Sequence, residues 1–596
     1  MPAVPGGKVM EHQSIQIEIN GAPFTVPKDA LIVEACKTAG FPVPTLCHLP
    51  GLCSNASCGV CVVEVGGAKT LVRSCVQKVS PGMKIVTNSS RVLQARKTVL
   101  ELLLANHPED CLSCLRNQTC ELQALAEQVG VRRGIYRPTK KKSPPDDAGA
   151  AIVRDNTKCI LCGRCVAACR EIQGVGAIDF MGRGLHTHIG TFMDRPLAQS
   201  VCVSCGQCTL VCPTGALTER DESDAVLAAI HDPEKLVVVQ TAPAIRSSLG
   251  EALGMPAGSL VTGSMVAALR RLGFDYVFDT QFAADLTIME EGTELLHRLS
   301  SGGVLPMITS CSPGWINFIE TFYPELLPHL STCKSPQQMF GAIAKTWWAK
   351  KMNIDPARII VVSIMPCTAK KYEARRPEMR DAYRWWNEQG YGGLPFDDVD
   401  YALTTRELAR MIRRVGIDFS LLPQEDFDAP LGLSTGAATI FASTGGVMEA
   451  ALRTAYELVT HKALPRLEFE TLRGMEGIKT AQVELDGTSL KVGVAHSLKN
   501  ARIVLEELRS GKSPYTFIEI MSCPGGCVGG GGQPLRTDWN KRELRQRAIY
   551  QEDQRLPLRK SHENPAVQEL YREFLGEPLG QVSHELLHTS YGPRRV

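Results

Sequence analysis

The chain opens with an alternating pattern of apolar and polar residues. Residues 15–19 read Ile-Gln-Ile-Glu-Ile, an Asn20-Gly21 pair follows, and residues 24–26 read Phe-Thr-Val. A period of two on both sides of an Asn-Gly pair predicts a β-hairpin. Apolar positions at helical spacing then predict helices over residues 29–38 and 92–105.

From residue 236 onward, short apolar runs alternate with glycine-rich turns and segments of helical periodicity. These runs predict strands at residues 236–240, 304–308, 359–364, 438–441, 491–495 and 517–520. Strands that alternate with helices predict parallel sheets with helices on their outer faces. Such sheets bind ligands beyond the carboxyl ends of their strands. Residues that follow these strands are therefore candidates for a functional site.

Length and composition indicate a large globular protein. The 596 residues suggest roughly four domains of about 150 residues each. A formal net charge of +2, with 44% hydrophobic and 21% charged residues, argues against disorder and against nucleic-acid binding. The short basic run 132–142 is interpreted as a solvated linker. Because no apolar run is long enough for a membrane span and no export signal is recognisable, we expect a cytoplasmic protein.

The 22 cysteines are the unusual feature of the composition. In a long cytosolic chain they are more typical of metal ligands than of disulfides, because the cytosol keeps thiols reduced. The first group is Cys47, Cys53, Cys58, Cys61 and Cys75.

Two choices exist for the first ligand of this group. Starting at Cys53 gives the spacing of plant-type 2Fe-2S ferredoxins. Starting at Cys47 gives a spacing that resembles the 2Fe-2S domain of the large iron-sulfur subunit of respiratory complex I. Residues 44–48 and 62–65 also resemble that subunit, which favours Cys47 and leaves Cys53 as a spare thiol. A zinc ribbon is the alternative, although its cysteines normally form two separated pairs.

A histidine and three cysteines follow the second predicted helix, with the spacing His107-x3-Cys111-x2-Cys114-x5-Cys120. Such a set suits tetrahedral zinc or a 4Fe-4S cluster with one imidazole ligand. The residues alone do not decide between the two. The position of the segment directly after a 2Fe-2S pattern resembles the same complex I subunit, and this resemblance favours the cluster.

An internal repeat then carries eight cysteines in the run typical of bacterial two-cluster ferredoxins. In such proteins the fourth cysteine of each run ligates the other cluster. One 4Fe-4S cluster should therefore take Cys159, Cys162, Cys165 and Cys212, and the other Cys202, Cys205, Cys208 and Cys169. Structural zinc has no use for this crossed spacing.

Further cysteines fall at the ends of predicted strands. Cys311, Cys367 and Cys523 follow the strands at 304–308, 359–364 and 517–520. Cys527 comes shortly afterwards within the glycine-rich stretch 521–534. Thiols that converge from three strand ends, in backbone able to approach closely, indicate a large inorganic ligand.

Three stretches resemble the active-site signatures of the FeFe hydrogenases. They read Thr-Ser-Cys-Ser-Pro-Gly-Trp at 309–315, Met-Pro-Cys-Thr-Ala-Lys-Lys-Tyr-Glu at 365–373, and Met-Ser-Cys-Pro-Gly-Gly-Cys at 521–527. Residues 281–294, 404–408 and 443–450 also read as family sequence, and the order of the cluster modules agrees. The resemblance covers essentially the whole chain.

The resemblance implies a multidomain α+β and α/β protein. The expected parts are a 2Fe-2S ferredoxin-like domain of β-grasp type (12–91), a His/Cys3 4Fe-4S domain (92–138), a linker (139–150), a two-cluster ferredoxin domain (151–222), a two-lobed hydrogenase domain with parallel sheets (235–540) and a wrap like the hydrogenase small subunit (541–596). The expected cofactors are one 2Fe-2S cluster, three 4Fe-4S clusters and an H-cluster.

The H-cluster implied by the resemblance joins a 4Fe-4S cubane to a two-iron unit that carries CO, CN and a bridging dithiolate. Cys367 and Cys523 would ligate the cubane, and Cys527 would bridge it to the two-iron unit. The other residues expected around the two-iron unit are Lys370 as hydrogen-bond donor to a cyanide, Met365, Met521, Gln337 and Gly526.

The chain departs from the commoner family pattern at Cys311-Ser312, where many members have two cysteines. By register Cys311 would deliver protons and Ser312 would occupy the position of a cubane ligand. The alternative is that Cys311 binds the cubane and Ser312 relays protons, because a thiolate is the better iron ligand. We favour the register.

The resemblance also implies a proton relay through Glu291, Glu294 and Ser331. The two glutamates lie three residues apart and so share a helical face. Proton delivery requires titratable groups within hydrogen-bond reach of one another. A surface acidic helix would explain the same composition.

The predicted function is the reversible conversion of protons and electrons to hydrogen. No nucleotide-binding glycine motif follows a predicted strand, so NAD(P) chemistry would belong to another subunit. The expected partners are flavin-, NAD(P)- or 2Fe-2S-binding subunits of a complex, including electron-bifurcating ones, or ferredoxin for a stand-alone enzyme. Ser312 and the complex I-like first domain favour the complex. A non-catalytic iron-sulfur sensor or scaffold is an alternative, but Lys370, Glu291 and the three signatures argue against it. A complex I-like relay subunit would share the N-terminal clusters but would not carry the three signatures.

Three cysteines remain unassigned, namely Cys36, Cys53 and Cys333. We expect each of them to be a core thiol.

Overall fold

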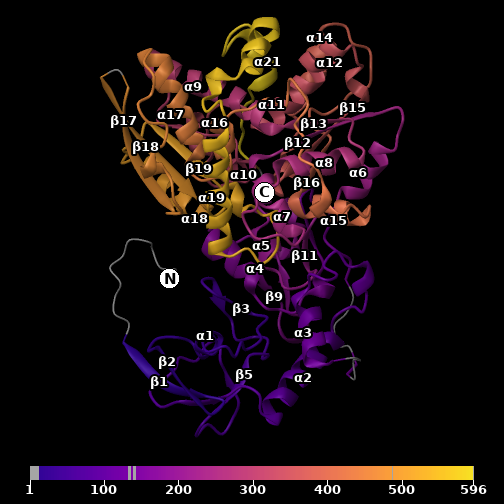
Figure 1. The fold of residues 1–596 in the computed structure, drawn as a ribbon, viewed down its shortest axis with the longest axis vertical. Helices are drawn as coiled ribbons and strands as arrows, with labels where there is room; N and C mark the ends of the chain where they lie inside the picture. The colour runs from indigo at the N-terminus through magenta and orange to yellow at the C-terminus, as the bar shows by residue number, and fades with distance from the viewer. Residues whose placement is uncertain (1–12, 132–135, 138–142, 486, 595–596) are drawn as a thin grey trace.

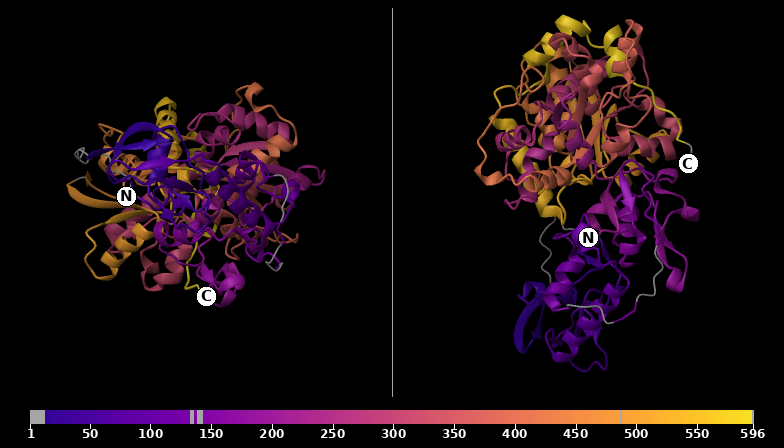
Figure 2. Two further views of the ribbon diagram at one scale, coloured as in Figure 1. Left: turned by 90° about the horizontal axis from the view of Figure 1, so that it is seen from below. Right: turned by 90° about the vertical axis from the view of Figure 1, so that its right-hand side faces the viewer.

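The computed structural model describes residues 13–131, 136–137, 143–485 and 487–594. The N-terminal third forms the lower part of the molecule in Figure 1, and the residues from β12 (Leu236–Thr241) onward form the larger upper part. α4 (Arg164–Ala167), α5 (Gln207–Val211) and β11 (Leu217–Glu219) lie where the two parts meet. The side view in Figure 2 shows the same division. The expected linker is described from residue 143, and residues 139–142 lie outside the described residues.

The first sheet has the strand order β2-β1-β7-β5-β6. β1 (Ser14–Ile19) and β2 (Ala22–Pro27) pair antiparallel, with Ile19 opposite Ala22. Asn20 and Gly21 both have positive φ, which suits a two-residue turn, so the predicted hairpin is confirmed. The remaining elements are β7 (Lys84–Val86), which runs parallel to β1, β5 (Val62–Val65), β6 (Val72–Arg73) and α1 (Ile32–Thr38). The helix begins three residues later than predicted.

Two helices and a repeated unit connect this sheet to the upper part. α2 (Ser90–Ala105) and α3 (Glu121–Val129) lie side by side in Figure 1. In the repeated unit, β8 (Ile152–Arg154) pairs antiparallel with β11. α4 and α5 each begin after a glycine in the left-handed region, Gly163 and Gly206. The two cysteine runs thus adopt the same local conformation, as an internal repeat predicts.

Two four-stranded sheets form the upper part. One has the order β13-β12-β15-β16 and is parallel throughout, with β13 (Tyr276–Asp279), β15 (Ile359–Met365) and β16 (Tyr401–Thr404). The other has the order β14-β19-β18-β17, with β14 (Met307–Ile308), β19 (Phe517–Met521), β18 (Thr488–His496) and β17 (Ile478–Leu485). β17 is antiparallel to β18. The prediction of parallel sheets therefore holds except at this edge strand.

The strand predicted at 438–441 is wrong. These residues lie in α16 (Gly436–Thr439) and in a 3-10 helix (Ile440–Ala442), and all of them are buried. A short apolar run does not distinguish a buried strand from a buried helix. The run at 304–308 forms only the two-residue β14, since Pro306 has no N–H with which to join a ladder. β13, β16 and β17 were not predicted.

One long helix runs through the interior of the upper part. α9 (Thr280–Ser301) packs against α11 (Pro336–Ile343) and α17 (Gly446–Thr460). The C-terminal α20 (Pro565–Leu570) and α21 (Gln581–Leu587) lie at the top in Figure 1, while α19 (Trp539–Arg555) runs down the front. α10 (Pro313–Phe322), α13 (Ala369–Glu373) and α18 (Leu498–Arg509) complete the surroundings of the strand ends. Within the described parts of the chain, every helix is too short or too polar to traverse a bilayer.

Candidate active site

The predicted site residues from four separate stretches meet in one cavity. β14, β15 and β19 end at Ile308, Met365 and Met521, and each is followed by one of the predicted cysteines. The cavity has a volume of about 90 Å³. Its walls include Cys311, Ser312, Gln337, Met365, Cys367, Lys370, Phe441, Met521, Cys523, Gly526 and Cys527. Phe441 comes from the segment that was wrongly predicted as a strand.

Glycines line the cavity where backbone segments pass very close to one another. Gly526 has a φ of +88°, and a Cβ there would lie 2.6 Å from the Thr444 nitrogen. A Cβ on Gly530 would lie 2.1 Å from the Pro366 carbonyl oxygen, and one on Gly531 would lie 2.2 Å from the Cys205 carbonyl oxygen. Any side chain at these positions would open the loop. The glycine-rich sequence therefore has a geometric cause.

The thiols in the cavity suit a metal cluster better than a thiol core. Burial and the neighbouring Cys367 raise the pKa of the Cys527 thiol to about 12. Burial, followed by Cys367 and Cys527, also raises the pKa of Cys523. Clustered thiols of this kind become thiolate ligands only when a metal compensates their charge. The donor set, the apolar walls and the close backbone therefore fit an iron-sulfur cofactor.

A carboxylate that was not predicted holds Lys370 in place. The Lys370 Nζ donates to the Glu373 Oε2 at 2.9 Å and to the Cys311 carbonyl oxygen at 3.2 Å. Glu373 also accepts from Ser335 at 2.9 Å and from Gln337 at 3.1 Å. The three-residue spacing of Lys370 and Glu373 on one helix is the signal that could have revealed the pair.

Cys311 and Ser312 face different parts of the cavity. Burial, followed by the Glu291 carboxylate, raises the pKa of Cys311, and Lys370 opposes that rise. The Ser312 Oγ lies 2.8 Å from the Ser522 Oγ and accepts from the Ser522 nitrogen at 3.3 Å. Cys311 is thus close to the predicted relay, whereas Ser312 is close to the loop that carries Cys523.

The predicted relay residues Glu291 and Glu294 lie on the buried side of α9, and Ser331 contacts Glu294 from outside this helix. Burial and the Glu294 carboxylate raise the pKa of Glu291 to about 8, and the nearby Ser331 hydroxyl and Ser310 backbone N–H oppose that rise. Ser331 Oγ donates to the Glu294 Oε2 at 2.8 Å, and the partly exposed Arg298 Nε donates to the Glu294 Oε1 at 3.1 Å. The alternative of a surface acidic helix is wrong, because Glu290 and Glu291 are fully buried.

The first cysteine group forms a compact set of thiols. The Cys47 thiol lies close to those of Cys58 and Cys75, and the Cys61 thiol lies close to that of Cys75. The Cys53 Sγ instead lies 3.6 Å from the Cys47 carbonyl oxygen. The structure therefore groups the four cysteines that follow the complex I-like spacing and leaves Cys53 outside.

The eight ferredoxin-type cysteines separate into two cavities in the crossed arrangement. One cavity is lined by Cys159, Cys162, Cys165 and Cys212. The other is lined by Cys169, Cys202, Cys205 and Cys208.

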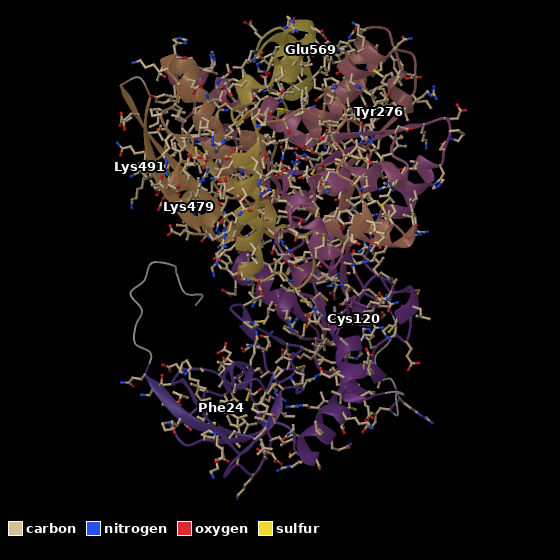
Figure 3. The ribbon with its side chains drawn as sticks, viewed as in Figure 1. Phe24, Cys120, Tyr276, Lys479, Lys491 and Glu569 are labelled. Carbon is tan, nitrogen blue, oxygen red and sulfur yellow. The ribbon has the colours of Figure 1, made fainter. Side chains whose placement is uncertain are left out.

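The His107 segment lies against the first of these cavities. Cys111 is exposed, and Cys120 begins α3 close to Cys114. The Cys114 Sγ lies 2.8 Å from where a Cβ on Gly215 would be, just after Cys212. Figure 3 places Cys120 in the lower part, below the junction with the upper part.

Direct contacts connect the candidate cluster sites to the active-site cavity. Asn55 donates to the Cys162 carbonyl oxygen at 2.8 Å, and Arg116 donates to that of Cys212 at 2.7 Å. Gln207, next to Cys208, donates to the Gly529 carbonyl oxygen at 2.9 Å. Both N-terminal modules thus contact the first ferredoxin-type cavity, and the second cavity adjoins the active-site loop.

Two known proteins are similar in sequence to nearly the whole of this chain. The chain is 50% identical to NADP-reducing hydrogenase subunit HndD of Solidesulfovibrio fructosivorans, covering 98% of this chain and 99% of that one. It is 39% identical to iron hydrogenase 1 of Clostridium pasteurianum, covering 96% and 99%. The chain belongs to the FeFe hydrogenase family.

The regions of this hydrogenase match five family descriptions. Residues 235–531 match the C-terminal domain of the iron-only hydrogenase large subunit, and residues 540–594 match the iron hydrogenase small subunit. The N-terminal matches are a 2Fe-2S cluster binding domain (12–90), the iron-sulfur binding region of NADH-ubiquinone oxidoreductase G (96–134) and the ferredoxin-like domain of NADH-quinone oxidoreductase subunit 3 (149–218).

A solved structure resembles a large part of the hydrogenase. A single-residue variant of the apo FeFe hydrogenase HydA1 of Chlamydomonas reinhardtii aligns with a TM-score of 0.56 at 44% identity. The alignment covers 63% of this chain and all of the other. The chain is therefore an oxidoreductase that acts on hydrogen and carries iron-sulfur clusters.

Proposed function

We propose that this hydrogenase holds an H-cluster through Cys367, Cys523 and Cys527 and exchanges protons through Cys311. The observation that carries the proposal is the single cavity in which these thiols meet Lys370. When bound, the H-cluster supplies the site at which hydrogen is formed or cleaved and its electrons are taken up. Lys370, held by Glu373, provides the hydrogen-bond donor, and Met365, Met521 and the surrounding glycines exclude water from the site.

Protons would pass between Cys311 and solvent through buried carboxyl groups. Glu291 lies next to Cys311, and its raised pKa lets it retain a proton up to about pH 8. Ser331 donates to Glu294, whose other oxygen accepts from Arg298 at the edge of the buried region. A carboxyl group that titrates near neutral pH is suited to both uptake and release of protons.

Electrons would enter through two N-terminal sites that converge on the Cys159–Cys212 cavity. We propose one 2Fe-2S cluster in the first domain, for which we propose the β-grasp type, and 4Fe-4S clusters in the His/Cys3 segment and in both ferredoxin-type cavities. The contacts of Asn55 and Arg116 with this cavity support the convergence. The contact of Gln207 with Gly529 supports transfer from the second cavity to the active site.

The full-length likeness to an NADP-reducing hydrogenase subunit and the complex I-like matches favour a subunit of an NAD(P)-linked complex. Purification from the native source with identification of the bound subunits tests this. A monomer that exchanges electrons only with ferredoxin would contradict it. Infrared bands of bound CO and CN in matured protein test the H-cluster, and their absence would contradict the enzyme site.

A further inference from the structure

The C-terminal segment brings a second group of titratable side chains against α9. His588, just after α21, forms an isolated β-bridge with Cys333. The Lys334 nitrogen donates to the Leu587 oxygen at 2.8 Å, and the Thr589 nitrogen donates to the Thr332 oxygen at 2.8 Å. Backbone hydrogen bonds therefore fix the imidazole next to the end of the proposed relay.

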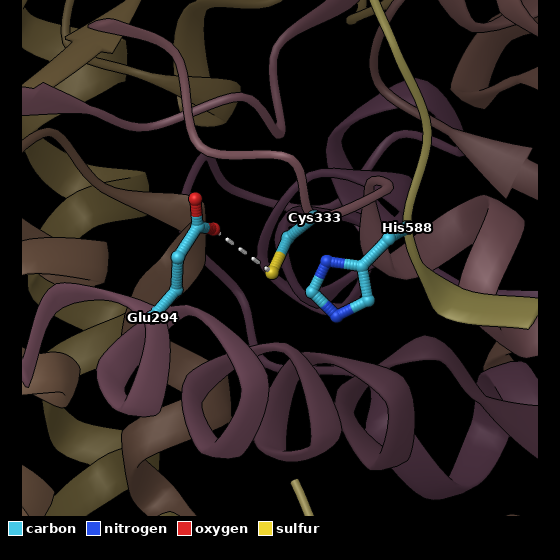
Figure 4. Close-up of side chains that lie close together, drawn as sticks. All are labelled: Glu294, Cys333 and His588. Carbon is cyan, nitrogen blue, oxygen red and sulfur yellow. Dashed lines mark hydrogen bonds between the residues drawn. The ribbon is translucent and has the colours of Figure 1, made fainter. Parts of the chain in front are cut away.

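Glu294, Cys333 and His588 form a compact buried cluster. A carboxylate oxygen, the thiol sulfur and a ring nitrogen all lie within 4.8 Å of one another. The Cys333 thiol donates to the Glu294 Oε2 at 3.8 Å. Figure 4 shows the thiol between the carboxylate and the imidazole.

This donor set resembles a zinc site, but its atoms already have partners. The His588 Nδ1 lies 2.8 Å from the Thr332 Oγ1, and the Nε2 lies 3.1 Å from the Glu290 Oε2. Both Glu294 oxygens accept hydrogen bonds as well. A metal would have to displace these bonds, so the cluster is better described as a hydrogen-bond network.

The side chains on the two sides of Glu294 differ in their ability to exchange a proton. On one side lies Arg298, whose guanidinium stays protonated and does not exchange protons by titration. On the other side lies His588, and imidazole is the side chain that gains and loses protons near neutral pH. The ring of the exposed His584 lies 4.4 Å from the ring of His588, measured between centroids. Two imidazoles therefore connect the surface to the buried cluster.

We propose that His584 and His588 form a second proton branch, through which the C-terminal segment connects Glu294 to solvent. The branch rests on the proposed role of Glu294 in the relay. In the inward direction, the Cys333 thiol gives its proton to the Glu294 carboxylate. It then takes a proton from the His588 imidazolium, whose ring N–H must first turn from Thr332 to the thiol, which lies within 4.8 Å. His588 is then neutral and is reprotonated from solvent through His584. One N–H bond breaks and one O–H bond forms, and the thiol is regenerated.

The charges around His588 suit this exchange. The Glu290 carboxylate accepts from His588 and from the Tyr571 hydroxyl, so a carboxylate lies against the Nε2 of the ring. Lys334 is engaged with Asp381 and Asp398. The titratable and charged groups that face the ring from the surrounding elements are Glu290, Glu294, Arg298, Cys333, Tyr571 and His584.

The decisive variant is His588→Gln, which has a side chain that can still donate toward Glu290 but cannot titrate. In the complete matured enzyme we expect hydrogen turnover about tenfold lower between about pH 5 and 8, with iron content and infrared bands unchanged. Added imidazole should restore turnover in His584→Ala, whose gap opens to solvent. His297→Gln, an exposed position on α9, is the matched control and should match the wild type.

The outcomes separate this branch from the relay on which it rests. If Glu291→Gln is inactive while His588→Gln and His584→Ala keep the wild-type pH profile, the relay stands and the branch is refuted. If Glu291→Gln is fully active, the relay itself fails. Should His588→Gln fail to fold, the surface variant His584→Ala decides, and absence of both a pH effect and imidazole rescue would overturn the proposal.

Discussion

Ser312 is the most informative single position in the active site, because the family resemblance leads us to expect a cysteine there. Cys311 is near Glu291 and Lys370, whereas Ser312 is near Ser522 and the Cys523 loop. We therefore expect Cys311→Ala to keep its cubane, with an ordinary EPR signal, and to lose at least about 100-fold in turnover because the proton donor is missing. Ser312→Cys should keep turnover. Loss of the cubane signal in Cys311→Ala would instead make Cys311 a ligand.

Glu291 should matter for turnover and not for cluster assembly. It is fully buried, and its raised pKa lets it exchange protons near neutral pH. We expect Glu291→Gln to lower turnover by at least about 100-fold with unchanged iron content. Hydrogen evolution and uptake assays measure this against His297→Gln, and comparable rates in both variants would refute the relay.

The Glu291 carboxyl group should also make the folded chain less stable as the pH rises. Its pKa is raised from 4.5 to about 8, so the folded chain binds an extra proton relative to the unfolded chain within that range. The contribution of the Glu291 proton to the stability of the folded chain is therefore fully present below about pH 4.5, and it is lost as the pH rises through about 8. In thermal unfolding, the Glu291→Gln variant should gain stability relative to the wild type as the pH rises from about 6 to 9. A difference that does not change with pH would contradict this.

Glu373 shows what sequence reasoning missed at this scale. The cysteines, Lys370 and the relay glutamates could be predicted because their spacing or their resemblance to family motifs carries the signal. Glu373 gathers Lys370, Gln337 and Ser335 only after folding, and His588 reaches Glu294 from the far end of the chain. Of these contacts, only the pair of Lys370 and Glu373 leaves a pattern in the sequence, namely a spacing of three residues on one helix.

At the scale of elements, buried segments were the hardest to predict. Residues 438–441 are apolar in either conformation, so only their tertiary surroundings make them helical. β16 is short. β17 was missed because it is followed directly by the antiparallel β18, whereas the prediction assumed that a helix follows each strand. The strands that precede Cys311, Cys367 and Cys523 were predicted from their apolar runs, and each is followed by a motif with its own signal. The sequence therefore locates the site more accurately than it locates the sheets that support it.

The glycine-rich loop after β19 gives a prediction at the scale of an element. A Cβ on Gly530 would lie 2.1 Å from the Pro366 carbonyl oxygen, and relief of this clash would move the loop that carries Cys527. We expect Gly530→Ala to lose the infrared bands of the two-iron unit while the ferredoxin-type EPR signals remain. Gly392→Ala has no atom within 4 Å of its Cβ and is the control. Normal bands in Gly530→Ala would show that the loop tolerates the side chain.

At the scale of the whole molecule, the contacts support the proposed electron path, which is forked. Asn55 and Arg116 connect the 2Fe-2S domain and the His/Cys3 segment separately to the first ferredoxin-type cavity. The second cavity lies between this junction and the active site, since Gln207 contacts Gly529. Loss of an N-terminal cluster should therefore lower hydrogen uptake less than loss of the cluster in the second cavity.

This difference gives a test of the fork. Cys61→Ala should lose the 2Fe-2S signal and yet retain most hydrogen uptake with a small redox dye, because electrons can leave through the His/Cys3 segment or the ferredoxin-type clusters. Cys205→Ala should lose most uptake, because its cavity lies between the active site and every other cluster. EPR of both variants verifies that only the intended cluster is missing. Complete loss of dye-linked uptake in Cys61→Ala, with all other clusters present, would show a single series path that ends at the 2Fe-2S domain.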